Sequence, residues 1–290
     1  MAHPLLDRDR IDVPPDVYLA EVGELFARFD ERTQDSGNRS YGVTIEGRQG
    51  GGRYFVKTAG PPDDTRWYLD HAGRVALLRN AVDLARSCDH PALPRLHNVV
   101  ETPHGPALVY EWVEGELVGV PAAERDDPES AFQRFRALPV EEVVGALDTV
   151  YDLHRDLASL GWVAGDFYDR VLIYDFDRCV MRVIDLDSYH RGRLTNQMGR
   201  MFGSSRFMAP EEFERGATID ECTTVFTLGR TAAVLLSDGT LDRAPFRGGD
   251  ALHAVVARAC RDARDERDER HATVGEFVSA FIDAWQAAGE

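Results

Sequence analysis

Residues 203 to 236 read GSSRFMAPEEFERGATIDECTTVFTLGRTAAVLL, and this stretch decides the fold. Its first part contains the sequence Met208-Ala209-Pro210-Glu211, and its second part is an apolar run within a mostly helical C-terminal region. The chain has 290 residues, which is enough to bury a substantial core in one large domain or in two lobes.

Aspartates stand at the ends of predicted elements upstream of this stretch. Residues 143 to 157 place apolar side chains at helical spacing, and residues 171 to 187, VLIYDFDRCVMRVIDLD, predict a β-hairpin. Asp166 lies between the helix and the hairpin, and Asp185 and Asp187 end the second strand. Mg²⁺ requires hard anionic oxygen ligands, so Asp185 is a candidate metal ligand. Turn formation is the alternative role for aspartates at strand ends.

A single lysine marks the first half of the chain. Of the 33 lysine and arginine residues, only Lys57 is a lysine. A compact ammonium differs chemically from a planar guanidinium, so the exception indicates a position at which arginine does not serve, unless it arose by chance. Lys57 ends the short apolar run Tyr54, Phe55, Val56, which predicts that it lies in a strand of a small sheet.

Other elements of the first half follow from periodicity. Apolar residues at helical spacing predict a helix over residues 16 to 30, and a second helix is expected over 72 to 87. Residues 36 to 58 predict a strand, a glycine-containing turn and a second strand, and further strands are expected around Val99 and over 108 to 110. The polar stretch from Gly115 to Pro128 resembles a linker, which places a domain boundary near Glu114.

Together these motifs resemble those of protein kinases over most of the chain, from about Gly37 to Trp285. Residues 208 to 211 contain the APE motif, and Ile184-Asp185-Leu186-Asp187 resembles the DFG motif with aspartate in place of glycine. The resemblance implies an α+β, bilobal protein kinase-like fold with a small antiparallel-sheet N-lobe and a mainly helical C-lobe. It also implies bound ATP and Mg²⁺, with Lys57 on the phosphates, Asp185 on the metal and Asp166 as catalytic base.

Two further segments resemble nucleotide-binding parts of the family. Gly37, Tyr41 and Gly42 fit the glycine loop, whose backbone N–H groups fold over phosphates, although an ordinary hairpin turn has the same pattern. Residues 107 to 117, ALVYEWVEGEL, resemble the hinge between lobes, and a strand followed by an acidic turn is the alternative. The hinge match implies adenine contacts from the backbone of Glu111 and Val113.

The same match implies a hydrogen bond from the ribose to Glu116. It makes Tyr110 the residue that limits the depth of the adenine site. Near the C-terminus, the match implies a buried ion pair between Arg270 and Glu211.

Several positions depart from the family pattern. The predicted helix over 72 to 87 has no glutamate to pair with Lys57, and its nearest acid is Asp83. Ala164 and Gly165 replace the His and Arg before the catalytic Asp, so activation by loop phosphorylation is less expected. Thr224 replaces the helix aspartate that supports the catalytic loop.

The metal-binding asparagine is also replaced, by Val171, or by Arg170 if the loop is one residue shorter. Asp169 and Asp187 are the candidate substitute ligands, and the alternative for Asp169 is to cap the turn before the hairpin. The sequence His154-Arg155-Asp156 spells the family's catalytic triplet. It continues a helical apolar stripe, however, so we interpret it as part of a helix.

The sequence therefore predicts a helical extension over residues 1 to 34, an N-lobe over 35 to 114 and a C-lobe over 115 to 290. The expected activity is phosphate transfer to serine or threonine of a protein substrate. A small-molecule kinase and an ATP-binding pseudokinase remain alternatives. The net charge of −17 argues against nucleic-acid and anionic-membrane partners, and the chain has no long apolar run, which predicts a cytoplasmic protein. The sequence leaves the oligomeric state open.

Overall fold

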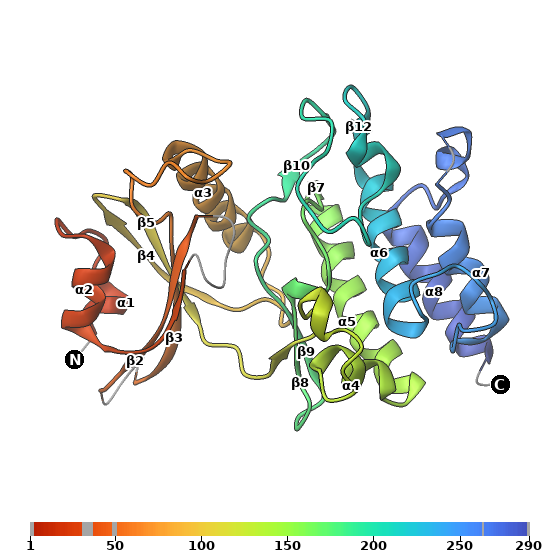
Figure 1. Cartoon of the computed structure of the whole chain (residues 1–290), viewed down its shortest axis with the longest axis horizontal. Helices are drawn as coiled ribbons and strands as arrows, with labels where there is room; N and C mark the ends of the chain where they lie inside the picture. The colour runs from red at the N-terminus through yellow and green to blue at the C-terminus, as the bar shows by residue number, and fades with distance from the viewer. Residues whose placement is uncertain (1–2, 31–36, 48–50, 263, 289–290) are drawn as a thin grey trace. The chain divides into compact units, whose positions relative to one another are not determined.

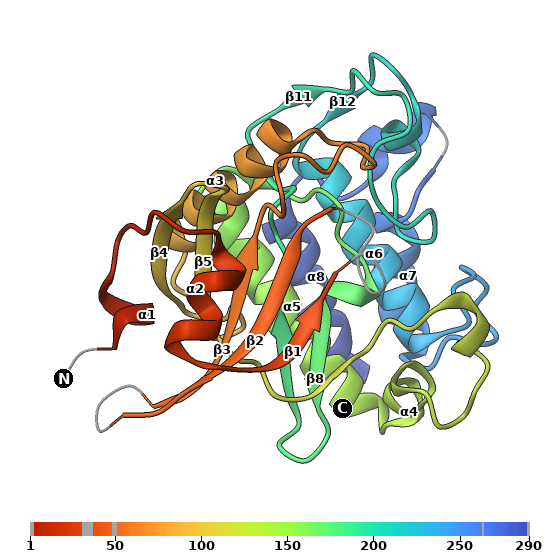
Figure 2. The same ribbon diagram turned by 60° about the vertical axis from the view of Figure 1, so that its left-hand side comes forward.

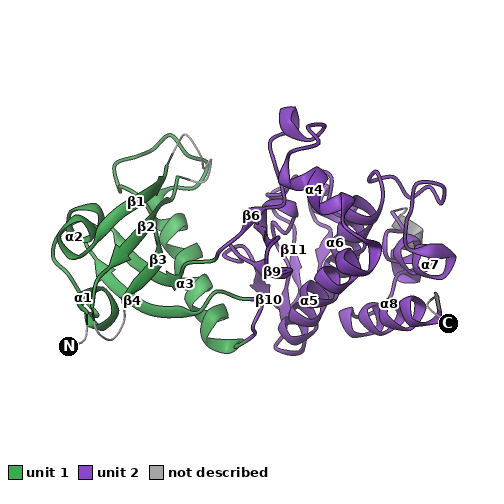
Figure 3. Cartoon of the chain, turned by 90° about the horizontal axis from the view of Figure 1, so that it is seen from below, with its two compact units in different colours: residues 1–89, 93–113 green, residues 90–92, 114–290 purple. Residues whose placement is uncertain are grey.

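The computed structural model describes residues 3–30, 37–47, 51–262 and 264–288 (Figure 1). The chain divides into two compact units, shown in Figure 3. Unit 1 comprises Met1–Asp89 and Leu93–Val113, and unit 2 comprises His90–Ala92 and Glu114–Glu290. The fold is α+β, with an N-terminal five-stranded antiparallel sheet followed by a more helical region, as the sequence predicted.

Unit 1 is built on that sheet. Its strands are β1 (Glu24–Phe29), β2 (Arg39–Ile45), β3 (Gly52–Thr58), β4 (Leu96–Thr102) and β5 (Gly105–Glu111). Their spatial order is β1-β2-β3-β5-β4, and each neighbouring pair is antiparallel. The expected strands at Lys57, Val99 and Leu108 are thus confirmed, and Lys57 lies on the central strand β3.

Helices cover both faces of this sheet (Figures 1 and 2). Side chains of α1 (Pro4–Asp7) and α2 (Pro15–Val22) form one core cluster with Tyr54 and Val56 of β3. Side chains of α3 (His71–Ser87) form another cluster with Leu108 of β5, the residue paired with Lys57. Because side chains alternate along a strand, Lys57 lies on the sheet face that α3 covers.

The helix predicted over residues 16 to 30 is wrong in its second half. Helix α2 ends at Val22, and residues 24 to 29 form the edge strand β1. Gly23 separates the two in an extended conformation, and a Cβ there would lie 2.6 Å from the Val43 side chain and 2.9 Å from the Thr44 carbonyl. Apolar spacing alone did not distinguish a helix from a short helix followed by a strand, since pairing with β2 is a tertiary interaction.

Unit 2 is mainly helical. Its helices are α4 (Ala131–Ala137), α5 (Val140–Ser159), α6 (Glu221–Leu236), α7 (Gly249–Ala259) and α8 (Val274–Ala288). The largely buried α6 lies among the others, and Tyr151 of α5 donates a hydrogen bond to the Leu228 carbonyl of α6 (3.1 Å) while packing on Phe277 of α8. Within the described ranges, no helix is both long and apolar enough to cross a membrane.

Short strands complete unit 2. The predicted hairpin is confirmed as β8 (Leu172–Asp175) and β9 (Val180–Val183), which form a sheet with β6 (Glu116–Leu117). Strand β7 (Trp162–Val163) pairs with β10 (His190–Arg191), and β11 (Leu194–Thr195) pairs with β12 (Thr218–Ile219). The β7–β10 pairing brings the segment after the hairpin alongside the segment that leads to Asp166.

One buried arginine fixes the connection between β3 and α3. Arg74 is 1% exposed, and its guanidinium donates hydrogen bonds to the carbonyls of Ala59 (2.8 Å), Pro61 (3.0 Å) and Leu69 (2.9 Å). A charged donor that satisfies several backbone carbonyls at once holds the connection against the first turn of α3.

We expect Arg74→Ala to lower the free energy of unfolding by about 3 kcal/mol, because it leaves buried carbonyls without a donor. The matched control on the same helix is Arg79→Ala. Arg79 forms an exposed pair with Glu101 and should contribute at most about 1 kcal/mol. Chemical denaturation of the two variants measures the difference, and equal losses would contradict the anchoring role of Arg74.

Candidate active site

Asp166 and Asp185 have unusual backbone conformations. Among the described residues, the only non-glycine residues with positive φ are Asp166 (55°), Cys179 (54°) and Asp185 (62°). The left-handed region is unfavourable for residues with a Cβ, and such strain is retained where the surrounding structure imposes it, often at functional sites. Cys179 lies in the turn of the β8–β9 hairpin. Both aspartates were singled out from the sequence on other grounds.

The segments that carry these aspartates pack against each other. The Ile184 N–H donates to the Val171 carbonyl (2.8 Å), and Val163 of β7 pairs with His190 of β10. A Cβ on Gly165 would lie 2.3 Å from the Ser188 carbonyl oxygen. Because the Ser188 carbonyl lies so close, only glycine fits at the position before Asp166. This explains why arginine is absent there.

Thr224 supports the segment before Asp166. Its Oγ1 accepts a hydrogen bond from the Ala164 N–H at 3.0 Å, and both residues are buried. The hydroxyl thus satisfies a backbone donor that would otherwise be buried without a partner. This threonine, at the position where protein kinases have an aspartate, anchors the segment to α6.

The helical interpretation of His154-Arg155-Asp156 is confirmed, since all three residues lie in α5. Buried His154 bonds the Val150 carbonyl through Nδ1 (2.7 Å) and the Tyr189 hydroxyl through Nε2 (2.6 Å). Burial lowers the pKa of His154 to about 4, so the ring is neutral. Since a carbonyl only accepts, Nδ1 donates and Nε2 accepts from Tyr189. The ring also packs edge-to-face on Phe167, next to Asp166.

Asp169 has a structural partner. It lies in the 3₁₀ turn Asp169–Val171, is buried, and its Oδ2 accepts a hydrogen bond from Arg206 Nη1 at 2.7 Å. The guanidinium of Arg206 also lies over the rings of Phe132 and Phe207. This ion pair links the end of the Asp166 segment to residues 203 to 211. A metal-binding role for Asp169 remains a prediction, and Arg206 would compete with the ion for its carboxylate.

The donor groups near Asp185 suit a partly hydrated ion. Asp187 is buried two residues after Asp185. Nowhere in the described chain do three or more His, Cys, Asp or Glu side chains form a group that could hold a metal ion. Mg²⁺ is typically held by one or two carboxylates together with phosphate oxygens and water. Asp185 and Asp187 fit that requirement, and their roles as ligands remain predictions.

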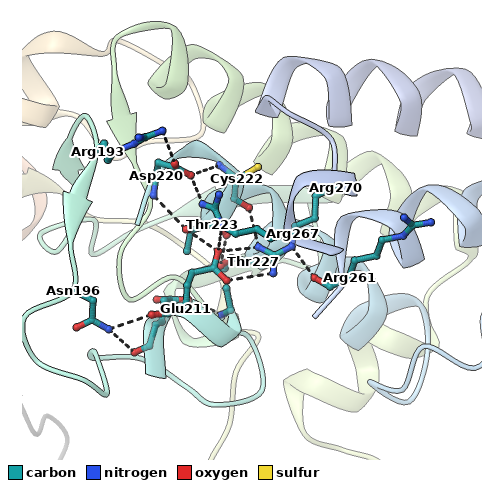
Figure 4. A network of polar contacts seen from close by, with 12 residues as sticks. Arg193, Asn196, Glu211, Asp220, Cys222, Thr223, Thr227, Arg261, Arg267 and Arg270 are labelled. Atoms are coloured by element: carbon teal, nitrogen blue, oxygen red, sulfur yellow. Dashed lines mark hydrogen bonds and ion pairs between the residues drawn. The ribbon is translucent and has the colours of Figure 1, made fainter. Parts of the chain in front are cut away.

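The predicted Glu211–Arg270 ion pair is confirmed (Figure 4). Arg270 binds Glu211 through two hydrogen bonds of 2.8 and 3.2 Å, and the Thr223 hydroxyl donates a third at 3.0 Å. Arg267 Nε lies 3.3 Å from the same carboxylate. Burial raises the pKa of Glu211, but the hydrogen bonds and charge of Arg270 outweigh it, so the pKa lies below its ordinary value.

A second buried acid, Glu212, was missed by the sequence analysis. It follows Glu211 in the 3₁₀ turn Pro210–Phe213, and its Oε2 accepts the Ala209 N–H at 2.7 Å. Its side chain lines a small cavity together with Asp166. Burial, and then the negative charges of Glu211 and Asp166, raise the pKa of Glu212 to about 8. The sequence does place two adjacent glutamates after Pro210, and only one of them can face Arg270. This pair could have indicated that the other glutamate has a separate role.

The strand predicted after Ser36 is confirmed as β2, so Tyr41 and Gly42 lie within a strand, and phosphate contacts of Gly37, Tyr41 and Gly42 remain predictions. Tyr41 is buried in the cluster with α1 and α2, on the sheet face opposite Lys57. A Cβ on Gly42 would lie 2.7 Å from the Phe26 ring, and one on Gly37 would lie 2.5 Å from Trp67. These glycines therefore make room for aromatic rings. The connection between β1 and β2 includes residues 31–36, which lie outside the described ranges.

The remaining candidates lie near the boundary between the units. Glu111 ends β5, and its N–H donates to the Arg95 carbonyl at 2.9 Å. Val113 is the last residue of unit 1. Glu116 begins β6 in unit 2, where its exposed carboxylate pairs with Arg134 at 2.8 Å. Their proposed contacts with adenine and ribose remain predictions.

Helix α3 does not present an acid to the sheet. Asp83 is exposed, whereas Lys57 is 5% exposed on the face that α3 covers. The buried charged residue of α3 is Arg74. The absence of a glutamate, noted from the sequence, is thus accompanied by a different polar anchor for the helix.

Comparison with known proteins gives a distant relationship. A segment of 104 residues is 28% identical to Serine/threonine-protein kinase 1 of African swine fever virus (isolate Tick/Malawi/Lil 20-1/1983). It covers 36% of this chain and 35% of the viral protein, so the chain matches about a third of that relative's length. No family model matches the chain. The match suggests a relationship to the protein kinase-like superfamily.

We expect Arg270→Ala to lower the free energy of unfolding by about 3 to 5 kcal/mol, because it leaves the buried Glu211 carboxylate without its main partner. The control is Arg178→Ala, which removes an exposed pair with Asp175 and should change stability by at most about 1 kcal/mol. Urea denaturation of both variants tests this. A loss below about 1 kcal/mol for Arg270→Ala would show that Arg267 alone is sufficient to neutralise Glu211.

Proposed function

We propose that this protein is an ATP-dependent phosphotransferase of the protein kinase-like type that phosphorylates serine or threonine hydroxyls of a protein. The observation that carries the proposal is the pair of left-handed aspartates, Asp166 and Asp185, on segments that pack together in unit 2. Strained backbone at two carboxylates in adjacent segments supports a functional constraint on both.

The proposed roles follow from the chemistry of each group. Asp166 accepts the proton of the attacking hydroxyl and orients that oxygen. Lys57, on β3, holds the phosphates through its compact ammonium. Asp185 and Asp187 hold Mg²⁺, which neutralises charge on the phosphates when bound. The backbone of Glu111 and Val113 contacts the adenine.

A protein acceptor is supported by two observations. The printed name of the viral relative is that of a serine/threonine-protein kinase. In addition, residues 203 to 211 are anchored by Glu211 and by the Asp169–Arg206 pair, which leaves this segment ordered beside the Asp166 loop. A small-molecule acceptor would give the same ATP consumption without phosphate on protein, so the assay below distinguishes the two.

ATP binding without transfer is the second candidate function. This second candidate is favoured by the residues found where protein kinases have a metal-binding asparagine. Val171 is buried there, and the neighbouring Asp169 is occupied by Arg206. In that case Lys57 and Asp185 would hold the nucleotide, and Asp166 would serve only the structure.

We expect Asp166→Asn to lower the rate of phosphate transfer by about 10²- to 10⁴-fold, because an amide cannot accept the proton. The matched control is Asp156→Asn, an exposed position on α5 that should leave the rate unchanged. The assay is incubation with γ-labelled Mg-ATP, scored for ATP loss and for label on serine and threonine by mass spectrometry.

A reversed order of these two effects would place the active site on the wrong element. If the wild-type protein binds Mg-ATP but neither consumes it nor becomes labelled with any added acceptor, the non-catalytic candidate replaces the enzyme.

We expect Lys57→Arg to abolish transfer and to weaken ATP binding, because a guanidinium cannot occupy the same point between two phosphates. Lys57 is buried within the sheet, so Lys57→Met is included as a smaller replacement. Calorimetric titration with Mg-ATP measures binding, and thermal unfolding checks that the fold is retained. Turnover at the wild-type rate in either variant would remove Lys57 from the site.

A further inference from the structure

Four arginines of unit 2 gather beside residues 203 to 211. They are Arg136 of α4, Arg206, Arg230 of α6 and Arg247, and we call them the arginine cluster. Arg247 is exposed, and the other three are partly exposed. The whole chain has 50 acidic and 33 basic residues and a net charge of −17. A local group of positive charges therefore does not follow from the composition.

The side chains of the cluster lie around shared points of the structure. The guanidinium carbons of Arg136 and Arg206 each lie 5.2 Å from the centre of the Phe132 ring. Arg230 Nε donates a hydrogen bond to the Arg206 carbonyl at 3.0 Å. Stacking on one buried ring and bonding to one segment hold these charges close together, although like charges repel.

Most hydrogen-bond partners of the cluster are uncharged. Three of the guanidinium groups bind backbone carbonyls just after the ends of α4 and α6: Arg136 binds Ser237, Arg230 binds Gly239 (2.8 Å) and Arg247 binds Leu138 (3.0 Å). Within the ranges that the structure describes, none of these three arginines forms an ion pair with a carboxylate. A carbonyl fixes a guanidinium but does not neutralise it, so positive charge remains.

Two acids offset part of this charge. Asp169 binds Arg206 at 2.7 Å, and Asp238 is the acid that acts on Arg136. Burial, and then the charges of Arg247 and Arg206, hold the pKa of Arg136 below its usual value, and Asp238 opposes this shift. Arginine stays charged in proteins despite such shifts. The four guanidinium groups are thus opposed by two carboxylates, which leaves a positive surface.

The cluster begins next to the candidate base. A Cβ on Gly203 would lie 3.6 Å from Asp166 Oδ1, and Arg206 follows Gly203 by three residues. Arg206 also binds Asp169, which follows Asp166 by three residues. An extended peptide advances about 3.3 Å per residue. A side chain two or three positions from an acceptor hydroxyl at Asp166 can therefore reach the first arginine of the cluster.

We propose that the arginine cluster binds acidic side chains of the protein substrate, within about three positions of the serine or threonine that Asp166 acts on. The inference rests on the proposed function and specifies its acceptor. A guanidinium binds carboxylates and phosphates through paired hydrogen bonds, so glutamate, aspartate and phosphoserine share the chemistry that the cluster recognises. Guanidinium groups already fixed by carbonyls lose little freedom when such a side chain binds.

The first test measures the preference among substrate peptides. Three peptides of equal length carry one serine flanked by glutamate, by alanine or by arginine residues. We expect the wild-type protein to phosphorylate the glutamate peptide with the highest kcat/KM. Arg136→Gln and Arg247→Gln should each raise KM for the glutamate peptide by about threefold to tenfold and leave KM for the alanine peptide unchanged. The matched control is Arg243→Gln, because Arg243 is already paired with Asp250.

Charge reversal gives a sharper result than neutralisation. Arg247 is exposed, so Arg247→Glu should fold, and thermal unfolding checks this. The variant should lose the preference for the glutamate peptide and phosphorylate the arginine peptide with a higher kcat/KM than the wild-type protein does. The same glutamate preference in folded Arg247→Glu and in the wild-type protein would overturn the proposal.

Binding can be measured without activity. The probe is a fluorescent glutamate peptide with alanine in place of the serine, and its anisotropy reports binding. Binding should weaken in Arg247→Glu and as salt is added, because the contacts are electrostatic. A matched peptide with phosphoserine in place of the glutamates tests whether earlier phosphorylation supplies the charge. Tighter binding of a single-stranded RNA of the same length would overturn the assignment to acidic peptides.

The two assays separate this inference from the proposed function. Equal kcat/KM for all three peptides would overturn the inference and leave the phosphotransferase in place. Arginine-dependent binding of the glutamate peptide, by a protein that transfers no phosphate, would contradict the proposed function and support the acidic-peptide site.

Discussion

The carboxylate of Glu211 is buried, and unit 2 is organised around its neutralisation. Moving an ionised carboxylate out of water costs several kcal/mol unless charge and hydrogen bonds compensate. Here Arg270, Arg267 and Thr223 all contact it (Figure 4). They come from the region before α8 and from the first turn of α6. A single charge thus fixes three segments that are far apart in the sequence.

The first turns of α6 connect the Glu211 carboxylate to the segment that contains the candidate base, Asp166. Thr223 donates to Glu211, and the next residue, Thr224, accepts from the Ala164 N–H just before Asp166. One helical turn later, Thr227 lines the cavity shared by Asp166 and Glu212. Thr223, Thr224 and Thr227 therefore contact, in turn, the Glu211 carboxylate, the segment before Asp166 and the cavity. A short hydroxyl suits each place because it can donate and accept within a closely packed helix surface.

The sequence was sufficient to predict the order and type of most elements, because their signals are local. Helical spacing identified α3 and α5, alternation and turn residues identified β8 and β9, and the motif at 208 to 211 led to the Glu211–Arg270 pair. The error occurred at residues 16 to 30, where strand pairing overrode the local helical pattern. Gly42 illustrates the reason: it faces the Phe26 ring across β1 and β2, a contact that no local pattern contains.

The residues of the candidate site could be proposed from the sequence, but the contacts that hold them could not. The positive φ of Asp166 and Asp185 depends on contacts between segments, and the approach of Gly165 to Ser188 is visible only in three dimensions. The same is true of Glu212, whose pKa is raised by burial and then by the charges of Glu211 and Asp166. Sequence spacing indicates which groups can take part, whereas protonation and orientation depend on the enclosing structure.

The polar anchor of α3 differs from that of the family pattern. In the family pattern, an acid on this helix pairs with the phosphate-binding lysine, so the helix position and the charge of the lysine depend on each other. Here the buried charge of α3 is Arg74, which binds carbonyls of the connection that begins just after Lys57. Backbone carbonyls keep their charge distribution whether or not nucleotide is bound. Arg74 therefore attaches α3 to this connection through backbone carbonyls, without the use of an acid on the helix.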